Sequence, residues 1–261
     1  MGIVIFATNG KKLFTSKHAQ NFREAVYEAF RTGVSLANAE LRDLEFGDGY
    51  LTNGDLSYAD LAKSNFQSAT LKAVSLTGAN FTDANLWHAT LEDCAAVKTD
   101  FSHTEFAYGK FTRCDLGHAK FRLSGLADAV FTACSLRYTD FSGAYLGAVE
   151  MPWVDLSNGT FEKTNLEQAN LAKIRARAAS FVDADLSQAS LAQADLSGAD
   201  FSRAKFLGAD LSGANFSNAN LLDADFAGAL IEGATFNGAN PDRALNLTGT
   251  QTKTQRKRTS L

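Results

Sequence analysis

A five-residue repeat constrains this chain more than any other feature. From Leu36 to Phe236 every fifth residue is Leu or Phe, and among these 41 centre positions the departures are Ala96, Met151, Ala176 and Ile231. The residue two before each centre is almost always small, and Asp or Asn frequently stands between the two. A period of five fits neither an amphipathic helix nor an alternating strand. The chain must therefore turn a corner every five residues, with the centre and the small residue both pointing inward.

A second period indicates how many corners complete one circuit. Seven consecutive phenylalanines recur at a spacing of 20, namely Phe81, Phe101, Phe121, Phe141, Phe161, Phe181 and Phe201. Four five-residue units per coil would place these rings in one interior column, separated by roughly 4.8 Å as in hydrogen-bonded strands. Stacked aromatic rings add about 0.5 to 1.5 kcal/mol per pair to simple burial. We therefore predict a coil of 20 residues with a filled interior.

The repeat resembles that of the pentapeptide-repeat family, whose unit has the form Ala-(Asp/Asn)-Leu-x-x. The triplets Ala59-Asp60-Leu61, Ala194-Asp195-Leu196 and Ala219-Asn220-Leu221 carry the resemblance, which covers about 205 of the 261 residues in one unbroken register. The resemblance implies an all-β fold, a right-handed, four-sided β-helix (solenoid). About ten coils at about 4.8 Å each predict a rod roughly 50 Å long.

Both ends of the repeat differ from its body. Residues 1–33 are expected to form an N-terminal cap, because two apolar segments flank the hairpin signal Asn9-Gly10 and precede an amphipathic stretch. Ser16 is the expected N-cap of a helix that buries Phe22, Val26, Ala29 and Phe30 and ends at Gly33. Residues 34–240 are expected to form the β-helix. Residues 241–261 are polar and basic and are expected to be a disordered tail, with weak nucleic-acid contact as the alternative.

The sequence offers no recognisable catalytic or metal site. Cys94, Cys114 and Cys134 fall at the small inward position of successive coils and are expected to be buried free thiols. His88, His103 and His118 are 15 residues apart, so each lies on a different side and they cannot share a metal ion. No phosphate loop, nucleophile elbow or zinc signature occurs. We therefore expect no enzyme activity, no cofactor and no metal.

Composition supports a folded, cytoplasmic protein. Hydrophobic residues make up 45% of the chain, with 20 Phe, 20 Gly and 2 Pro, which excludes collagen-like and disordered chains. No apolar stretch reaches the length that a membrane helix needs, and the short apolar opening lacks the basic flank of a secretory signal. No membrane partner is expected.

Charge is unevenly distributed over the four predicted sides. The first side, centred on Leu41, Leu61, Phe81 and their successors every 20 residues, has a net charge of −4; the second, centred on Phe46, Phe66, Leu86 and successors, has −6. The third side, from Leu51 onward, and the fourth, from Leu36 onward, come to −1 and 0. The predicted partner-binding acidic residues are Glu45, Asp48, Asp60, Asp83, Asp100, Glu105, Asp128, Asp140, Asp183, Asp185, Asp200 and Asp225.

Such a stripe of charge can steer a rod toward a basic surface. The resemblance implies a specific version, because members of the quinolone-resistance group imitate DNA toward type II topoisomerases such as DNA gyrase. About one net charge per 5 Å is sparser than one per roughly 1.7 Å in duplex DNA, so the mimicry would be partial. The sequence departs from that group in its polar tail and continuous register, although a dimer through the N-terminal cap stays open.

An alternative hypothesis is a protein-binding scaffold that recognises its partner by shape and exposed aromatic residues, without DNA mimicry. Trp87, Tyr108 and Trp153 fall at outward positions. Dependence of binding on charge and salt would separate the two hypotheses. Direct binding to nucleic acid is not expected beyond weak contact through the tail.

Overall fold

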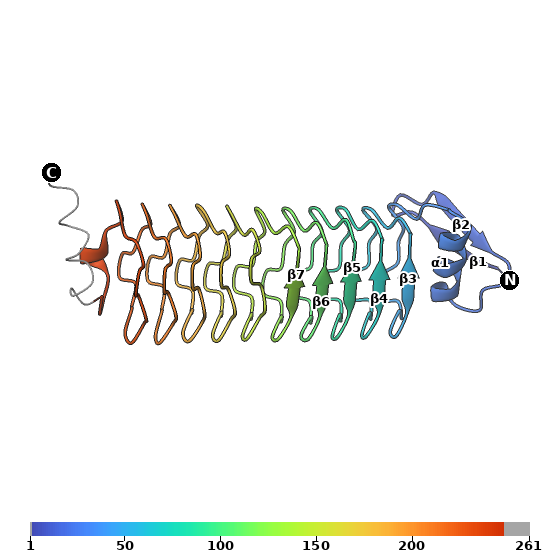
Figure 1. Cartoon of the computed structure of the whole chain (residues 1–261). Coiled ribbons are helices and arrows are strands. Elements are labelled where there is room, and N and C mark those ends of the chain that lie inside the picture. The colour runs from blue at the N-terminus through green and yellow to red at the C-terminus, as the bar shows by residue number, and fades with distance from the viewer. Residues whose placement is uncertain (1, 248–261) are drawn as a thin grey trace.

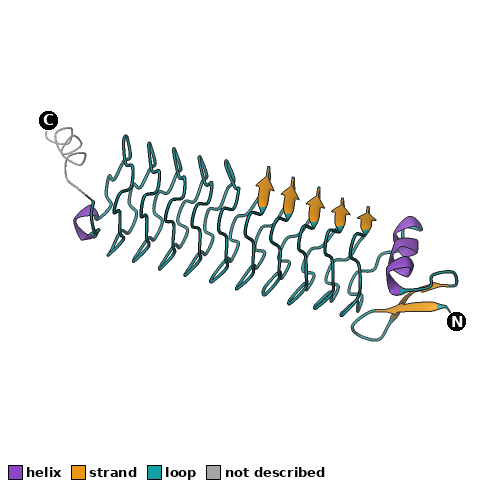
Figure 2. Ribbon diagram, turned by 90° about the horizontal axis from the view of Figure 1, so that it is seen from below, coloured by secondary structure: helices purple, strands orange, loops and turns teal. Residues whose placement is uncertain are grey.

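The protein is a β-solenoid with a small hairpin and helix at its N-terminal end (Figure 1). The computed structural model describes residues 2–247. Hydrogen-bonded bridges join residues 20 apart along the solenoid, from Glu40–Asp60 to Asp225–Leu245. They form four ladders, offset from one another by five residues, so the chain has four sides per coil as the repeat predicts. Figure 2 shows the same coils from a second direction.

Tight turns make the corners between the sides. The backbone N–H of the small residue donates to the carbonyl of the preceding centre, as Ala59 does to Leu56 at 3.0 Å. The residue just before the small one has a positive φ, for example 58° at Tyr58 and 67° at Trp153. Such turns normally favour Gly or Asn at that position. Here bulky residues also occupy it, since the ladder bonds on both sides of the corner hold the backbone in place.

The third side contains the regular strands. They are β3 (Tyr50–Thr52), β4 (Thr70–Lys72), β5 (Thr90–Glu92), β6 (Lys110–Thr112) and β7 (Val130–Thr132). They pair in parallel, in sequence order, and each residue faces the one 20 positions later. The 20-residue register therefore aligns like positions of successive coils.

Stacked columns of side chains fill the interior. The seven phenylalanines from Phe81 to Phe201 lie in one column, fully buried, with neighbouring ring centroids 4.7 to 5.1 Å apart. Polar side chains at the small position donate hydrogen bonds to backbone carbonyls. Thr99 Oγ1 donates to the carbonyl of Leu76 at 2.7 Å, and Ser64 Oγ donates to that of Leu41 at 2.8 Å. Because inward groups are either apolar or paired, the interior is a packed core.

The N-terminal cap consists of β1 (Ile3–Phe6), β2 (Lys12–Ser16) and α1 (Phe22–Arg31). The two strands pair antiparallel, and Ala7 bridges to Ala39 at the start of the solenoid. Helix α1 buries Val26, Ala29 and Phe30, as predicted.

Two details of the predicted helix were wrong. The N-cap is Asn21, whose side chain accepts from the N–H of Glu24; Ser16 ends β2, and its hydroxyl accepts from the N–H groups of His18 and Ala19. Phe22 is 41% exposed instead of buried. Starting the helix at Asn21 puts Phe22 at its first position, outside the face that packs on the solenoid.

The C-terminal end of the ladder lies beyond the expected boundary at 240. The short 3-10 helix η1 (Pro241–Arg243) lies on the preceding coil, where the N–H of Asp223 donates to the carbonyl of Arg243. Leu245 still bridges to Asp225. The predicted start of the disordered tail at 241 is therefore wrong, because residues 241–245 still contact the solenoid. Residues 248–261, which contain most of the basic residues of the tail, lie outside the described part of the chain.

Candidate partner-binding faces

Carboxylates on the ladders accept hydrogen bonds from backbone N–H groups of their own turn. Asp60 Oδ1 accepts a hydrogen bond from the N–H of Ala62 at 3.2 Å, and Asp225 Oδ1 from that of Ala227 at 3.0 Å. The same bond is made by asparagine at equivalent positions, as from Gln67 to Asn65 at 3.0 Å. The local-turn role predicted for these residues is therefore present. Because asparagine performs it equally, the negative charge of an aspartate here is not needed for the turn.

Ion pairs remove much of the charge on the first side. Five of the twelve predicted acidic residues are paired with a basic residue: Asp60 with Arg42, Asp100 with Lys120, Asp140 with Arg122, Asp183 with Arg203 and Asp185 with Lys205. All but the Asp185 pair lie on the first side. The basic partner comes from a neighbouring coil in each pair. The first side is therefore a mosaic of opposite charges.

The pKa of three of these paired acids, Asp100, Asp183 and Asp185, is lowered. Two hydrogen bonds from the Arg203 guanidinium, at 2.6 and 2.8 Å, hold the pKa of Asp183 below its usual value. Partial burial raises the pKa of Asp185, but hydrogen bonds from Ser187 and the charge of Lys205 outweigh it and the net shift is downward. These acids are therefore ionised at neutral pH and already committed to an internal partner.

The second side keeps most of its carboxylates unpaired, with Asp185 as the exception. Seven predicted acidic residues form no ion pair with another described residue: Glu45, Asp48, Asp83, Glu105, Asp128, Asp200 and Asp225. Five of them lie on the second side, where Lys205 is the one base. Along the bridges of the four ladders, neutral or basic residues separate the acids, with Glu40–Asp60 on the first side as the exception. The unpaired carboxylates are therefore spread along the second side.

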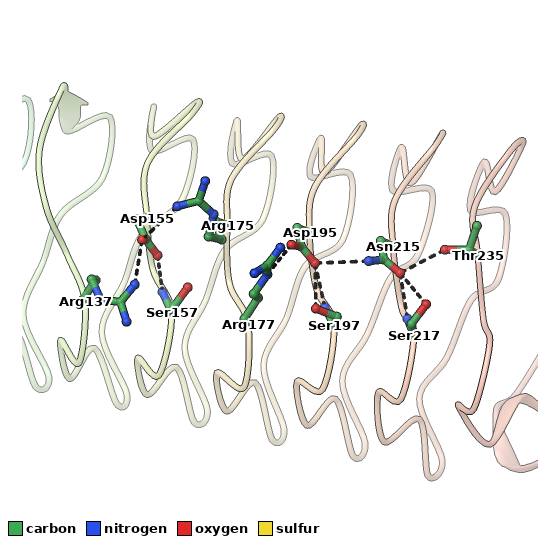
Figure 3. A network of polar contacts seen from close by, with 10 residues as sticks. All are labelled: Arg137, Asp155, Ser157, Arg175, Arg177, Asp195, Ser197, Asn215, Ser217 and Thr235. Carbon is green, nitrogen blue, oxygen red and sulfur yellow. Dashed lines mark hydrogen bonds and ion pairs between the residues drawn. The ribbon is translucent and has the colours of Figure 1, made fainter.

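The fourth side shows the opposite arrangement (Figure 3). Asp155 Oδ2 lies 3.0 Å from Arg137 and 3.4 Å from Arg175, and Asp195 Oδ2 lies 2.5 Å from Arg177. Amide and hydroxyl groups continue the chain of bonds, from Asn215 to Asp195 at 3.3 Å and from Thr235 to Asn215 at 3.0 Å. Charge on this side is internally compensated, which leaves the second side as the chief anionic surface.

The three histidines of the solenoid do not lie close enough together to bind one metal ion. His88, His103 and His118 each occupy a corner with a positive φ, on three different corners of the coil. Within residues 2–247 no group of three His, Cys, Asp or Glu residues could hold a metal ion. No helix in that same range has the length and apolar composition of a membrane span.

The three cysteines are free and buried. Cys94 Sγ donates to the carbonyl of Leu71 at 3.3 Å, and Cys114 Sγ to that of Leu91 at 3.3 Å. The contact with the Cys114 thiol and burial both raise the pKa of Cys94. All three sulfur atoms are buried inside the coil, where a reagent in solvent cannot reach them. The cysteine column is therefore part of the core.

A hollow of about 700 Å³ lies where α1 meets β3. Glu24 and Glu28 line it, but the first accepts from the backbone of Gln20 at 2.7 Å and the second from Ser16 Oγ at 2.5 Å. Both carboxylates are thus hydrogen-bonded to other residues of the N-terminal cap. The Ser16 hydroxyl that contacts Glu28 is fully buried and does not line the hollow, so the hollow presents no nucleophile beside a base.

Exposed aromatic residues form a second class of candidate contacts. Trp87, Tyr108 and Trp153 are 41%, 47% and 72% exposed, at the outward positions expected from the repeat. Tyr145, on the second side, is 52% exposed and was not singled out from the sequence. Writing the sequence in rows of 20 would have placed it two rows below Glu105, on the same ladder. The ion pairs could not be found in this way, because they depend on side-chain directions.

Comparisons with known proteins agree with this architecture. A family model described as pentapeptide repeats matches eight copies over residues 124–162, 179–218 and 209–240, and one described as a pentapeptide repeat region matches residues 64–141. Together they cover more than half of the chain. No curated protein matches the sequence.

Solved structures of repeat proteins resemble the solenoid. HetL, a pentapeptide repeat protein involved in heterocyst differentiation regulation from the cyanobacterium Nostoc sp. strain PCC 7120, is 24% identical, with a TM-score of 0.51; the match covers 85% of this chain and 95% of HetL. QnrB1, a plasmid-mediated fluoroquinolone resistance protein, is 21% identical over 81% of this chain and 95% of its own, with a TM-score of 0.41. The likeness to HetL concerns the fold alone.

Proposed function

Because this chain belongs to the pentapeptide-repeat family, we propose that it is a non-enzymatic rod that binds a protein partner through its outer faces. The packed interior supports this proposal, since the seven stacked phenylalanines are fully buried and leave no room for a substrate among them. Recognition must then use side chains on the four sides and at the corners.

We further propose that the second side is the principal binding face and that its partner is a DNA-binding protein. The observation that carries this proposal is the set of carboxylates on that side that have no ion pair within residues 2–247: Glu45, Asp48, Glu105, Asp128, Glu167 and Asp225. An unpaired carboxylate exerts its full field on an approaching basic surface, whereas a paired one does not. The second side is therefore a partial DNA mimic, and DNA gyrase, a type II topoisomerase, is the partner class to test.

Supercoiling of relaxed plasmid by purified DNA gyrase tests this function. The full-length protein at micromolar concentration should inhibit the reaction, and added linear duplex DNA should relieve the inhibition by competing for the same surface. Raising the salt concentration should weaken inhibition, because the contact is between exposed charges. Absence of inhibition at low salt would rule out gyrase as the partner, and inhibition that DNA does not relieve would rule out mimicry.

The exposed aromatic residues favour the scaffold as the second candidate function. In that case substitution of Trp87 and Trp153 should weaken partner binding more than substitution of the acidic residues, and salt should have little effect. Charge reversal of Asp128 and Asp225 should weaken binding most if the second side is used.

A further inference from the structure

Aromatic side chains gather on the second side near the middle of the solenoid. Trp87 meets His88 edge-on at 4.1 Å between ring centroids, and His88 stacks on Tyr108 at 5.0 Å with an interplanar angle of 14°. His88, Tyr108 and Asp128 are corner residues of three successive coils. Since His88 covers one face of the Tyr108 ring, the other face is turned toward the coil that contains Asp128.

That coil presents small side chains to solvent. Its outward residues on the second side are Gly125, Ala127 and Asp128, and the Glu105 carboxylate lies over Gly125, because a Cβ placed there would be 2.7 Å from Oε2. The next coil carries Tyr145, whose ring lies along its own coil over Gly147. Two tyrosines and two carboxylates therefore surround a short segment with little side-chain bulk.

Two other exposed aromatic rings of the solenoid have a cation from the chain itself. Lys173 Nζ lies 4.2 Å from the centroid of Trp153, and the Arg137 guanidinium carbon lies 5.7 Å from that of Tyr138. Tyr138 is a close counterpart of Tyr108, since it occupies a corner and stacks on a histidine, His118, at 4.7 Å. Among residues 2–247, no cation lies over Tyr108, Trp87 or Tyr145, and neither Glu105 nor Asp128 has an ionic partner.

We propose that this patch, made of Trp87, His88, Tyr108, Tyr145, Glu105 and Asp128, binds an arginine side chain of the basic partner. The inference rests on the proposed function and specifies its central contact. A guanidinium is planar, so it can lie on the free face of Tyr108 while its N–H groups donate to the two carboxylates. Lysine has the charge without the plane or the fork of donors, so the patch should prefer arginine. Exposed aromatic and arginine residues are also the usual hot spots of interfaces.

Peptide binding to the full-length protein tests the proposal. The probes are acetylated octa-arginine and octa-lysine, titrated at low salt. The chain has two tryptophans, so two indole N–H signals in a proton–nitrogen NMR spectrum distinguish the patch from Trp153. The variants are Tyr108→Ala and, as a matched control, Tyr138→Ala. Both substitutions suit the backbone, because alanine occupies equivalent corners at positions 73, 133 and 148.

Octa-arginine should shift the Trp87 signal and leave that of Trp153 in place, and should bind more tightly than octa-lysine. Tyr108→Ala should weaken octa-arginine binding about tenfold, with Tyr138→Ala within twofold of the wild type. Joint replacement Glu105→Gln and Asp128→Asn should abolish the preference for arginine.

Two results would overturn the proposal in distinguishable ways. Equal binding of the two peptides, insensitive to Tyr108→Ala but weakened by replacement of any second-side carboxylates, would refute the arginine site and leave the acidic binding face intact. Failure of both peptides to bind at low salt would refute the acidic binding face as well.

Discussion

At the residue scale, each inward phenylalanine is held by the rings above and below it. Phe141 stacks on Phe121 at 4.9 Å and on Phe161 at 5.1 Å. Phe141→Ala would leave a cavity that the coils cannot close without breaking their ladders. We expect it to lower the free energy of unfolding by about 3 to 5 kcal/mol in urea denaturation. A loss under about 1 kcal/mol would show that the ring is not in a packed column.

Ion-paired aspartates on the first side make stability depend on pH. The pKa of Asp183 is lower in the folded chain than in the unfolded one, because Arg203 donates to its carboxylate. Its contribution is present above the ordinary aspartate pKa of about 4 and is lost as pH falls through the lowered value. The free energy of unfolding, measured in urea from neutral to acid pH, should therefore fall below about pH 4. Asp183→Asn and Arg203→Met should each reduce this fall to the same extent; an unchanged fall would mean that the pair does not stabilise the fold.

The inward and outward positions of residues could be predicted from sequence, because one register of five fixes both. The phenylalanine column, the buried cysteines and the turn-forming aspartates follow from that register alone. The division of the acids into paired and unpaired groups does not follow from it. Arg42 reaches Asp60, 18 residues on, whereas Arg203 reaches back 20 residues to Asp183. Side-chain rotamers at exposed corners decide between such contacts, and the repeat does not encode them.

At the scale of elements, the docking of α1 on the first coil depends on a missing side chain. Gly54 stands at a small inward position, and a Cβ there would lie 2.0 to 2.2 Å from ring atoms of Phe30. Gly54→Ala should therefore displace Phe30 and loosen the cap. We expect a loss of about 1 to 3 kcal/mol in the free energy of unfolding.

A double-mutant cycle separates this clash from other effects of alanine at position 54. In a Phe30→Ala background, Gly54→Ala should cost much less, since no ring remains to be displaced. Equal costs in the two backgrounds would contradict the contact between Phe30 and Gly54.

The cap also shows where local sequence signals are ambiguous. Ser16 and Asn21 are both good N-cap residues, and the amphipathic pattern alone did not choose between them. The hairpin decides, because pairing Ser16 with Ile3 keeps that residue in β2. The helix then begins after Asn21, and Phe22 stays exposed.

At the scale of the whole molecule, the solenoid gives the chain four long faces and no interior site among its stacked rings. Bases interspersed on the first side pair with four of its ten acids, and arginines pair with two of the four acids of the fourth side. On the second side one of seven acids, Asp185, has an ion pair within residues 2–247. This separation is the basis of the proposed function. Neutral or basic residues between the acids also limit repulsion along the ladders, which makes the face less dense in charge than DNA.

The affinity for purified DNA gyrase as a function of salt concentration tests this central claim most directly. The second-side variant combines Glu45→Gln, Glu105→Gln, Asp128→Asn and Asp225→Asn. The control variant combines Asp115→Asn, Glu150→Gln, Asp210→Asn and Glu232→Gln, which removes equal charge from the other sides. Asparagine preserves the turn bonds in both.

We predict that the second-side variant binds at least tenfold more weakly at low salt and loses most of the salt dependence, and that the control variant behaves like the wild type. Equal weakening of the two variants would contradict the claim, because net charge alone would then account for binding.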